Sequence, residues 1–137
     1  MELLLDTGIF VIFFKKEKEY DKVKTIIDEI EGGGTKALIS SITLSEIFYV
    51  FARYSGEDFA RIIIDYIKSS PINALPVTDS VAEKAGELKF KYGGKQIKKG
   101  LPLADCIIAA TALENNAVLV THDKHFEKIK SLKTQWV

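Results

Sequence analysis

Short apolar runs alternate with amphipathic stretches along this chain, and the two periods predict its elements. Compact apolar runs bounded by polar or turn residues are typical of buried strands, whereas apolar residues three and four apart are typical of helices. We predict extended segments at Leu3–Leu5, Lys36–Ser40, Ile72–Val77, Ala117–Thr121 and Leu132–Trp136, the last as an edge strand. We predict helices over Ile9–Phe14, Tyr20–Ile30, Ile42–Arg53, Asp58–Ser69, Asp79–Tyr92 and Leu103–Glu114, and a short one starting at Asp123.

This alternation predicts an α/β fold with a parallel sheet covered by helices on both faces. Such sheets place their functional sites beyond the carboxyl ends of the strands. The length of 137 residues favours a single domain. The glycine clusters at 32–34 and 93–94 are interpreted as loops within that domain rather than as boundaries.

The charge balance and the cysteine count exclude several classes of protein. Lys plus Arg and Asp plus Glu both total 19, so the formal net charge is zero. A uniformly basic surface for nucleic acid is thereby excluded, although a local patch is not. Cys106 is the single cysteine, which excludes an intrachain disulfide and a cysteine-based zinc finger. With no basic leader and no long apolar run, we expect a cytoplasmic protein without a membrane partner.

Two acidic residues follow predicted strands directly. Asp6 comes right after Leu3–Leu5, and two residues separate Asp123 from Val118–Val120. Both stand where an open α/β sheet builds its site. Either aspartate could instead cap the helix that follows it, since aspartate is a preferred N-cap residue.

Two further acidic residues lie within predicted helices. Thr43 and Glu46 have the spacing of a capping box, but apolar residues one turn to either side favour a partly buried Glu46 carboxylate. Asp105 lies in the almost wholly apolar segment Leu101–Ala110. It could simply complement the helix dipole, yet an acid is almost never fully buried unless it is paired. Asp105 therefore needs a cation, hydrogen-bond donors or a wet cleft.

Taken together, the four acids predict a metal centre. No basic residue lies within three positions of Asp6, Glu46 or Asp105, so convergence of these carboxylates would leave their repulsion unrelieved. Mg²⁺ or Mn²⁺ relieves it, because both ions prefer oxygen ligands. Such a site suits phosphoryl chemistry, in which one ion can activate a water while it, or a second ion about 3.5–4 Å away, stabilises the leaving oxygen.

Four segments together resemble the PIN domain: Leu3–Thr7, Ser41–Glu46, Leu101–Ala112 and Leu119–Phe126. Their order and spacing are similar to the VapC toxin branch of type II toxin–antitoxin systems, and the resemblance covers essentially the whole chain. It implies a three-layer α/β/α fold around a mostly parallel sheet. It also implies a Mg²⁺- or Mn²⁺-dependent endoribonuclease that leaves a 5′-phosphate and a 3′-hydroxyl without a covalent intermediate. The implied partners are RNA, a second copy in a homodimer, and an antitoxin whose tail blocks the acidic cleft.

By position, the resemblance assigns Asp6 and Asp105 as direct metal ligands. Glu46 and Asp123 would bind the ion directly, bind it through water, or position the nucleophile, and the Thr121 hydroxyl would support the site. One departure is Gly8, which stands where many relatives have a small polar residue. That departure puts a supporting hydrogen bond in question rather than the metal site.

A run of lysines precedes Asp105, with no acid after Glu87. The run is either a solvated helix end and loop or a phosphate guide for RNA. The guide would use three residues in particular, Lys95, Lys98 and Lys99, and Lys89 and Lys91 belong to the same run.

Other reactive or aromatic side chains are given less specific interpretations. His122 and His125 flank Asp123 without a third histidine, so zinc is not favoured and we expect them outside the metal ligands. Cys106 is expected in the core. Six aromatic residues are expected mostly in the core, with some at a protein interface: Phe48, Tyr49, Phe51, Tyr54, Phe59 and Tyr66.

Three other functions are weighed against the toxin ribonuclease. A non-toxin PIN nuclease for RNA processing or decay would have the same acidic site. An inactive PIN-fold module that binds RNA or protein is opposed by the presence of all four acids. A receiver-type phosphoacceptor domain would need an acidic pair after the first strand, where Asp6 is followed by Thr7 and Gly8. We therefore predict a metal-dependent endoribonuclease that is the toxin of a toxin–antitoxin pair.

Overall fold

A parallel β-sheet forms the middle layer of the protein. The structure is a computed structural model that describes residues 1–93 and 100–137. Every strand pairing in the sheet is parallel, and the strand order is β3-β2-β1-β4-β5. The strands are β1 (Leu3–Leu5), β2 (Ala37–Ser40), β3 (Asn73–Leu75), β4 (Val118–Thr121) and β5 (Thr134–Trp136). The last of these is an edge strand, as predicted.

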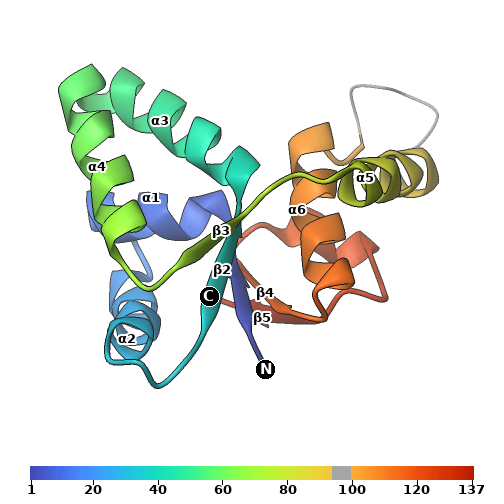
Figure 1. The fold of residues 1–137 in the computed structure, drawn as a ribbon, viewed down its shortest axis with the longest axis horizontal. Helices are drawn as coiled ribbons and strands as arrows, with labels where there is room; N and C mark the ends of the chain where they lie inside the picture. Colours follow the sequence, from blue (N-terminus) through green and yellow to red (C-terminus); the bar gives the residue numbers. More distant parts are fainter. Residues whose placement is uncertain (94–99) are drawn as a thin grey trace.

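Helices cover both faces of this sheet (Figure 1). One face carries α1 (Thr7–Lys15), α2 (Tyr20–Glu31), α3 (Ser41–Ser55) and α4 (Glu57–Ser69). The other carries α5 (Asp79–Tyr92), α6 (Leu103–Glu114) and the 3₁₀ helix η1 (Lys124–Lys128). The predicted three-layer α/β/α class is confirmed, with a sheet that is entirely rather than mostly parallel. Among the described residues, no helix combines the length and apolarity needed to cross a bilayer.

The central strands are apolar at successive positions because both of their faces are buried. Leu4 packs in the core beneath α5 and α6, whereas Leu5 packs in the core beneath α1 to α4. In β4, Leu119 likewise packs in the core with α5 and α6, and Val120 packs in the core with α1 to α4. Since alternate strand residues point to opposite faces, a doubly covered strand needs apolar side chains at each position. This requirement accounts for the short continuous apolar runs in the sequence.

Strand register brings the ends of β1 and β4 to one edge of the sheet. Leu5 pairs with Val120, and the backbone N–H of Asp6 donates to the Val120 carbonyl at 3.0 Å. The chain leaves the sheet here, because α1 begins at Thr7 and α3 begins at Ser41, directly after β2. The carboxyl edge therefore presents helix N-termini and strand ends side by side.

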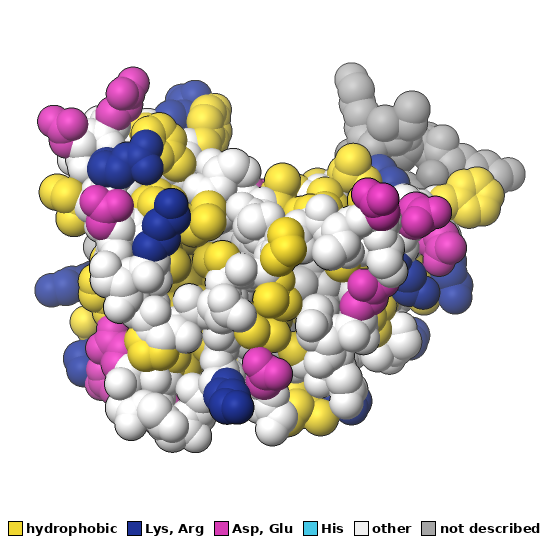
Figure 2. All heavy atoms as spheres, in the orientation of Figure 1, with side chains coloured by type: hydrophobic (Ala, Val, Ile, Leu, Met, Phe, Trp, Pro, Cys, Tyr) yellow, Lys and Arg dark blue, Asp and Glu magenta, His cyan; other side chains and the backbone are white. Residues whose placement is uncertain are grey.

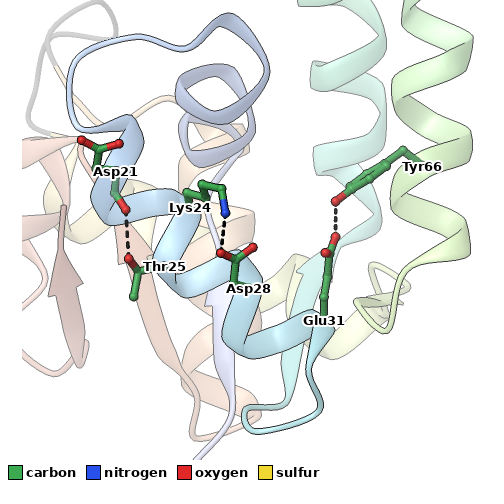
Figure 3. Close-up of polar contacts among 6 residues, drawn as sticks. All are labelled: Asp21, Lys24, Thr25, Asp28, Glu31 and Tyr66. Atoms are coloured by element: carbon green, nitrogen blue, oxygen red, sulfur yellow. Dashed lines mark hydrogen bonds and ion pairs between the residues drawn. The ribbon is translucent and has the colours of Figure 1, made fainter.

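A hydrogen bond between side chains joins α2 to α4 (Figure 3). The Tyr66 hydroxyl of α4 donates to the carboxylate of Glu31, the last residue of α2. Within α2, Lys24 pairs with Asp28 one turn further on, at 2.6 Å. Burial first, and then the bond to Glu31, raises the pKa of Tyr66 to about 12. The tyrosine thus stays a hydrogen-bond donor at neutral pH.

Candidate metal centre

Asp6 lies at the junction of β1 and α1, where both of its carboxylate oxygens are engaged. The residue is 6% exposed. Its Oδ1 accepts a hydrogen bond from the Thr7 backbone N–H at 2.8 Å, and its Oδ2 accepts one from the Thr121 hydroxyl at 2.7 Å. Asp6 is the N-cap of α1, so the capping interpretation is confirmed. The cap also presents a carboxylate at the carboxyl edge of the sheet.

Thr121 connects Asp6 to Asp123. Its buried hydroxyl donates to Asp6 and accepts a hydrogen bond from the Asp123 backbone N–H at 3.0 Å. Asp123 in turn caps η1, because its Oδ1 accepts the His125 backbone N–H at 2.9 Å. The Thr121 hydroxyl thus holds Asp6 and Asp123 close together, although they lie 117 positions apart in the sequence.

The capping-box interpretation of Glu46 is wrong. The N-cap of α3 is Ser40, whose hydroxyl accepts a backbone N–H at 3.3 Å. Thr43 therefore lies inside the first turn, and Glu46 lies beyond that turn, where no cap is needed. The Glu46 side chain is half-buried, and its Oε1 accepts a hydrogen bond from the Thr7 hydroxyl at 2.7 Å. Glu46 is thereby directed toward the junction that holds Asp6.

Asp105 completes the group from the first turn of α6. Burial, followed by the negative charges of Asp6, Asp123 and Glu46, raises the pKa of Asp105 to about 7. Burial also raises the pKa of Asp6 to about 6, against the lowering effect of its bonds to Thr121 and Thr7. Asp123 and Glu46 raise the Asp6 pKa further. The structure therefore brings the four predicted acids together.

These side chains line a pocket of about 450 Å³ at the carboxyl edge of the sheet. Its wall consists of Asp6, Thr7, Gly8, Val11, Ile12, Glu17, Glu46, Asp105, His122 and Asp123. A larger pocket of about 720 Å³ lies at the opposite edge, lined by Met1, Glu2, Gly34, Thr35, Lys36, Asn115 and Asn116. That pocket contains a single acid and no convergent carboxylates, so the smaller pocket is the candidate site.

His125, which we expected outside the metal ligands, lies close to Asp123 and Asp105 and is a candidate ligand. Its Nδ1 lies 3.3 Å from Oδ1 of Asp123. Asp105, Asp123 and His125 each offer a ligand atom, and the three atoms lie within 4.8 Å of one another. His122 also lines the pocket, but its Nδ1 lies 2.6 Å from the carbonyl oxygen of Val137. The position of His125 one short turn beyond a capping aspartate is the sequence signal that would have indicated it.

The donor set is chemically suited to a divalent cation. Carboxylate oxygens are the ligands that Mg²⁺ and Mn²⁺ prefer, and an imidazole nitrogen is compatible with transition metals. Burial first, and then repulsion from the other carboxylates, raises the pKa values of Asp6 and Asp105, and a bound cation would lower them. The residues present therefore fit the ion that the sequence predicts.

The three lysines of the suggested phosphate guide, Lys95, Lys98 and Lys99, lie outside the described residues. Two earlier members of the run are described. The Lys89 ammonium donates to the Leu101 carbonyl at 2.6 Å, just before α6. Lys91 lies 5.3 Å from the ring centre of Tyr92. Lys89 thus contacts the segment that leads into Asp105.

Of the six aromatic residues, the three phenylalanines lie in or against the core as expected, whereas the three tyrosines are exposed, so half rather than most of the set is in the core. Phe51 is fully buried, and Phe48 and Phe59 pack against the same core. The tyrosines are more exposed: Tyr49 at 62%, Tyr54 at 58% and Tyr66 at 37%. The Tyr66 ring packs against Phe13 and Phe14 of α1 and the Tyr54 ring against Phe59. The hydroxyls of Tyr49 and Tyr66 have polar partners, as is usual for tyrosine. Cys106 is buried, as expected.

The chain matches one known family of proteins. The PIN domain family matches residues 3–132, and the chain belongs to that family. No curated protein matches the chain by sequence.

Three solved structures illustrate the likeness. VapBC2 from Rickettsia felis, bound to a DNA fragment from its promoter, is 23% identical with a TM-score of 0.75, covering 99% of this chain and 98% of that one. A toxin–antitoxin complex from Klebsiella pneumoniae is 25% identical with a TM-score of 0.69, covering 96% and 95%. VapC20 from Mycobacterium tuberculosis, a sarcin–ricin loop cleaving toxin, is 15% identical with a TM-score of 0.74, covering 92% and 93%.

Proposed function

We propose that this protein is a metal-dependent endoribonuclease and the toxin of a toxin–antitoxin pair. The observation that carries the proposal is the convergence of Asp6, Glu46, Asp105 and Asp123 on one pocket of a PIN domain. Four carboxylates with one shared pocket favour a divalent cation, Mg²⁺ or Mn²⁺, over direct binding of a phosphate. A bound ion would supply the Lewis-acid chemistry for attack of water on phosphorus.

In this proposal the protein's own groups hold and orient the ion. Asp6 and Asp105 are the direct ligands, since burial of both carboxylates favours exchange of a proton for a cation. Glu46 and Asp123 hold the ion or its water molecules. Thr121 keeps Asp6 and Asp123 in register through its hydroxyl. Hydrolysis then proceeds without a covalent enzyme intermediate, because no nucleophilic side chain takes part.

The solved structures that are similar to this chain support the partners in this proposal. A similar structure is described as a toxin that cleaves the sarcin–ricin loop, which supports RNA as the substrate. Others are VapBC or toxin–antitoxin complexes, which supports an antitoxin as a protein partner. The exposed rings of Tyr49 and Tyr54 offer the apolar surface that a homodimer or an antitoxin would cover. A cytoplasmic location is part of the same proposal.

RNA cleavage with and without Mg²⁺ or Mn²⁺ tests the proposal. The wild-type protein is compared with Asp6→Asn, Asp105→Asn and the control Asp65→Asn, which alters an exposed acid on α4. We expect cleavage only with the ion, a loss of about 100-fold or more in the first two variants, and unchanged activity in the control. Metal-independent cleavage that survives both site substitutions would refute the mechanism.

The non-toxin PIN nuclease remains the second candidate, because it would share the same site. A small antitoxin-like reading frame next to the gene, together with inhibition of cleavage by its product, supports the toxin. Cleavage of a processing intermediate without growth arrest supports the alternative. Failure of the protein to bind Mn²⁺ in calorimetry would instead favour an inactive binding module.

A further inference from the structure

We propose that Thr7 is a positioning residue of this metal centre, and that its hydroxyl holds the Glu46 carboxylate in place for the cation. The inference deepens the proposed function and rests on it. Thr7 is the first residue of α1, and it uses its two hydrogen-bond donors on two different acids. Its backbone N–H donates to Asp6 at 2.8 Å, and its hydroxyl donates to Glu46 at 2.7 Å.

Glu46 needs such support more than Asp6 or Asp123 does. The two aspartates have short side chains, and each is fixed by capping a helix. Glu46 has a longer side chain with more rotatable bonds, and it projects from the middle of α3. Among the described residues, no lysine, arginine or histidine forms an ion pair with it. The Thr7 hydroxyl is the contact that selects one orientation of this carboxylate.

Thr7 is itself held rigidly enough to do this. Its backbone is fixed by the Asp6 cap, and β-branching restricts its side chain to few rotamers. The buried hydroxyl of Thr43 lies 3.5 Å from the Thr7 hydroxyl, which is a long contact that still limits where the Thr7 oxygen can lie. Within the described part of the chain, Oε1 of Glu46 is engaged by Thr7 and Oε2 has no protein partner. The free oxygen is available to a cation or to its water.

Two threonines then link three of the four acids into one chain of hydrogen bonds. Thr7 joins Glu46 to Asp6, and Thr121 joins Asp6 to Asp123. Within the described residues, Asp105 stands outside this chain. Ligands that are oriented by other hydrogen bonds bind a metal with less reorganisation, so loss of such a partner weakens metal binding. Thr7 therefore orients Glu46 as Thr121 orients Asp6, each through a hydrogen bond from its hydroxyl to the carboxylate.

Isothermal titration calorimetry with Mn²⁺ on Thr7→Val and Thr7→Ser tests the inference. Valine keeps the shape and the backbone N–H but removes the hydroxyl, whereas serine keeps the hydroxyl. We expect Mn²⁺ affinity to fall about 10–100-fold in the valine variant and to stay near the wild-type value in the serine variant. Thr111→Val is the control, because it removes a buried hydroxyl whose bond among the described residues stays within α6, to the Ile107 carbonyl.

A double-variant cycle shows whether Thr7 acts through Glu46. In a Glu46→Gln background, we expect Thr7→Val to cause little further loss of Mn²⁺ affinity, since the carboxylate it positions is already gone. In RNA cleavage, we expect Thr7→Val to lower kcat with KM nearly unchanged. Thermal denaturation of each variant separates these effects from unfolding.

The outcomes distinguish this inference from the proposed function. Wild-type Mn²⁺ affinity in Thr7→Val, or equal losses in the valine and serine variants, would overturn the positioning role while leaving the nuclease proposal intact. Additive losses in the cycle would also overturn it. A wild-type protein that binds Mn²⁺ without cutting RNA would overturn the proposed function, and the calorimetric comparison would still decide the role of Thr7. A wild-type protein that binds no Mn²⁺ would overturn both.

Discussion

Asp6 and Asp105 carry the clearest electrostatic strain of any residues in the described structure. Burial and neighbouring carboxylates raise their pKa values to about 6 and about 7, against about 3.9 for an aspartate in an unfolded chain. Without a cation, the folded protein therefore holds protons that the unfolded chain has already released. The arrangement that favours metal binding opposes folding at neutral pH.

This strain predicts a pH-dependent stability in the presence of a chelator. Between about pH 4 and pH 7 the folded state binds more protons, so the free energy of unfolding should fall as the pH rises through this window. Asp105→Asn should remove the larger part of this decrease in the free energy of unfolding, because asparagine does not ionise and Asp105 has the higher pKa of the two aspartates. Urea denaturation should show this variant to be more stable than the wild type at about pH 7.5 and little changed at about pH 4.5.

The exposed substitution Asp65→Asn is the matched control for that experiment. It should shift the free energy of unfolding by similar small amounts at both pH values. Adding Mn²⁺ should stabilise the wild type and not Asp105→Asn, since a ligand that binds only the folded state stabilises it. Equal pH profiles for the wild type and Asp105→Asn would contradict the assignment of strain to Asp105.

Gly8 provides a second prediction for a single residue. It lies in the first turn of α1 and lines the pocket, and a Cβ placed there would meet no atom within 4 Å. Glycine is less favourable than alanine in a helix, so Gly8→Ala should raise the free energy of unfolding by about 0.5–1 kcal/mol. Gly33 also has open space but a φ of +82°. Gly33→Ala should therefore destabilise the protein by about 1 kcal/mol. Thermal denaturation checks both predictions. Destabilisation by Gly8→Ala, or stabilisation by Gly33→Ala, would contradict them.

At the scale of the elements, local patterns predicted the helices and strands well. The helices at Asp79–Tyr92 and Leu103–Glu114 have the predicted bounds, because the end signals are close in the sequence. The capping box failed since Ser40 and Thr43 both carry hydroxyls that can cap a helix, and only the end of β2 decides between them. Where two nearby residues could each cap a helix, the end of the preceding strand decides which of them does.

Contacts between side chains of different elements could not be predicted from the sequence. Thr7 and Glu46 lie 39 positions apart, and their hydrogen bond depends on how α1 packs against α3. The four acids could be predicted, since each stands at a strand end or in an apolar segment. The residues that orient them could not, because a threonine beside an aspartate is equally compatible with a simple helix start.

The short helix η1 leads to a prediction about metal preference. It places His125 beside Asp123 and within reach of Asp105, and an imidazole nitrogen favours transition metals over Mg²⁺. His125→Ala should therefore lower Mn²⁺ affinity about tenfold in calorimetry, with a smaller change for Mg²⁺. The control is His122→Ala, which removes the only other histidine of the chain. Equal losses for both ions, or equal effects of both substitutions, would exclude coordination by His125.

At the scale of the whole molecule, zero net charge conceals an uneven distribution. On the face shown in Figure 2, acidic and basic side chains are interspersed, without a continuous surface of one sign. The pocket, by contrast, gathers Asp6, Glu46, Asp105 and Asp123. Phosphate should be repelled from this pocket until a cation is bound. RNA affinity without metal should accordingly be modest.

The lysine run before Asp105 predicts how RNA reaches such an acidic pocket. Lys95, Lys98 and Lys99 lie outside the described residues, and it is their charge and their place in the sequence that favour this role. Neutralising phosphates releases counterions, and for a single strand each contact contributes about 0.7 to the slope of log K against log salt. Replacing the three lysines by glutamine should weaken RNA binding and reduce this slope by about 2.

Binding is measured over a salt titration in an Asp105→Asn background, where RNA should stay intact. A control triple variant replaces Lys22, Lys24 and Lys68, which lie on α2 and α4, and it removes the same net charge from the protein. If the lysines guide phosphates, only the first triple variant should show the reduced salt slope, because contact rather than total charge releases counterions. Equal slopes in both triple variants would assign the effect to net charge. An unchanged slope in the first would leave the run as a solvated loop.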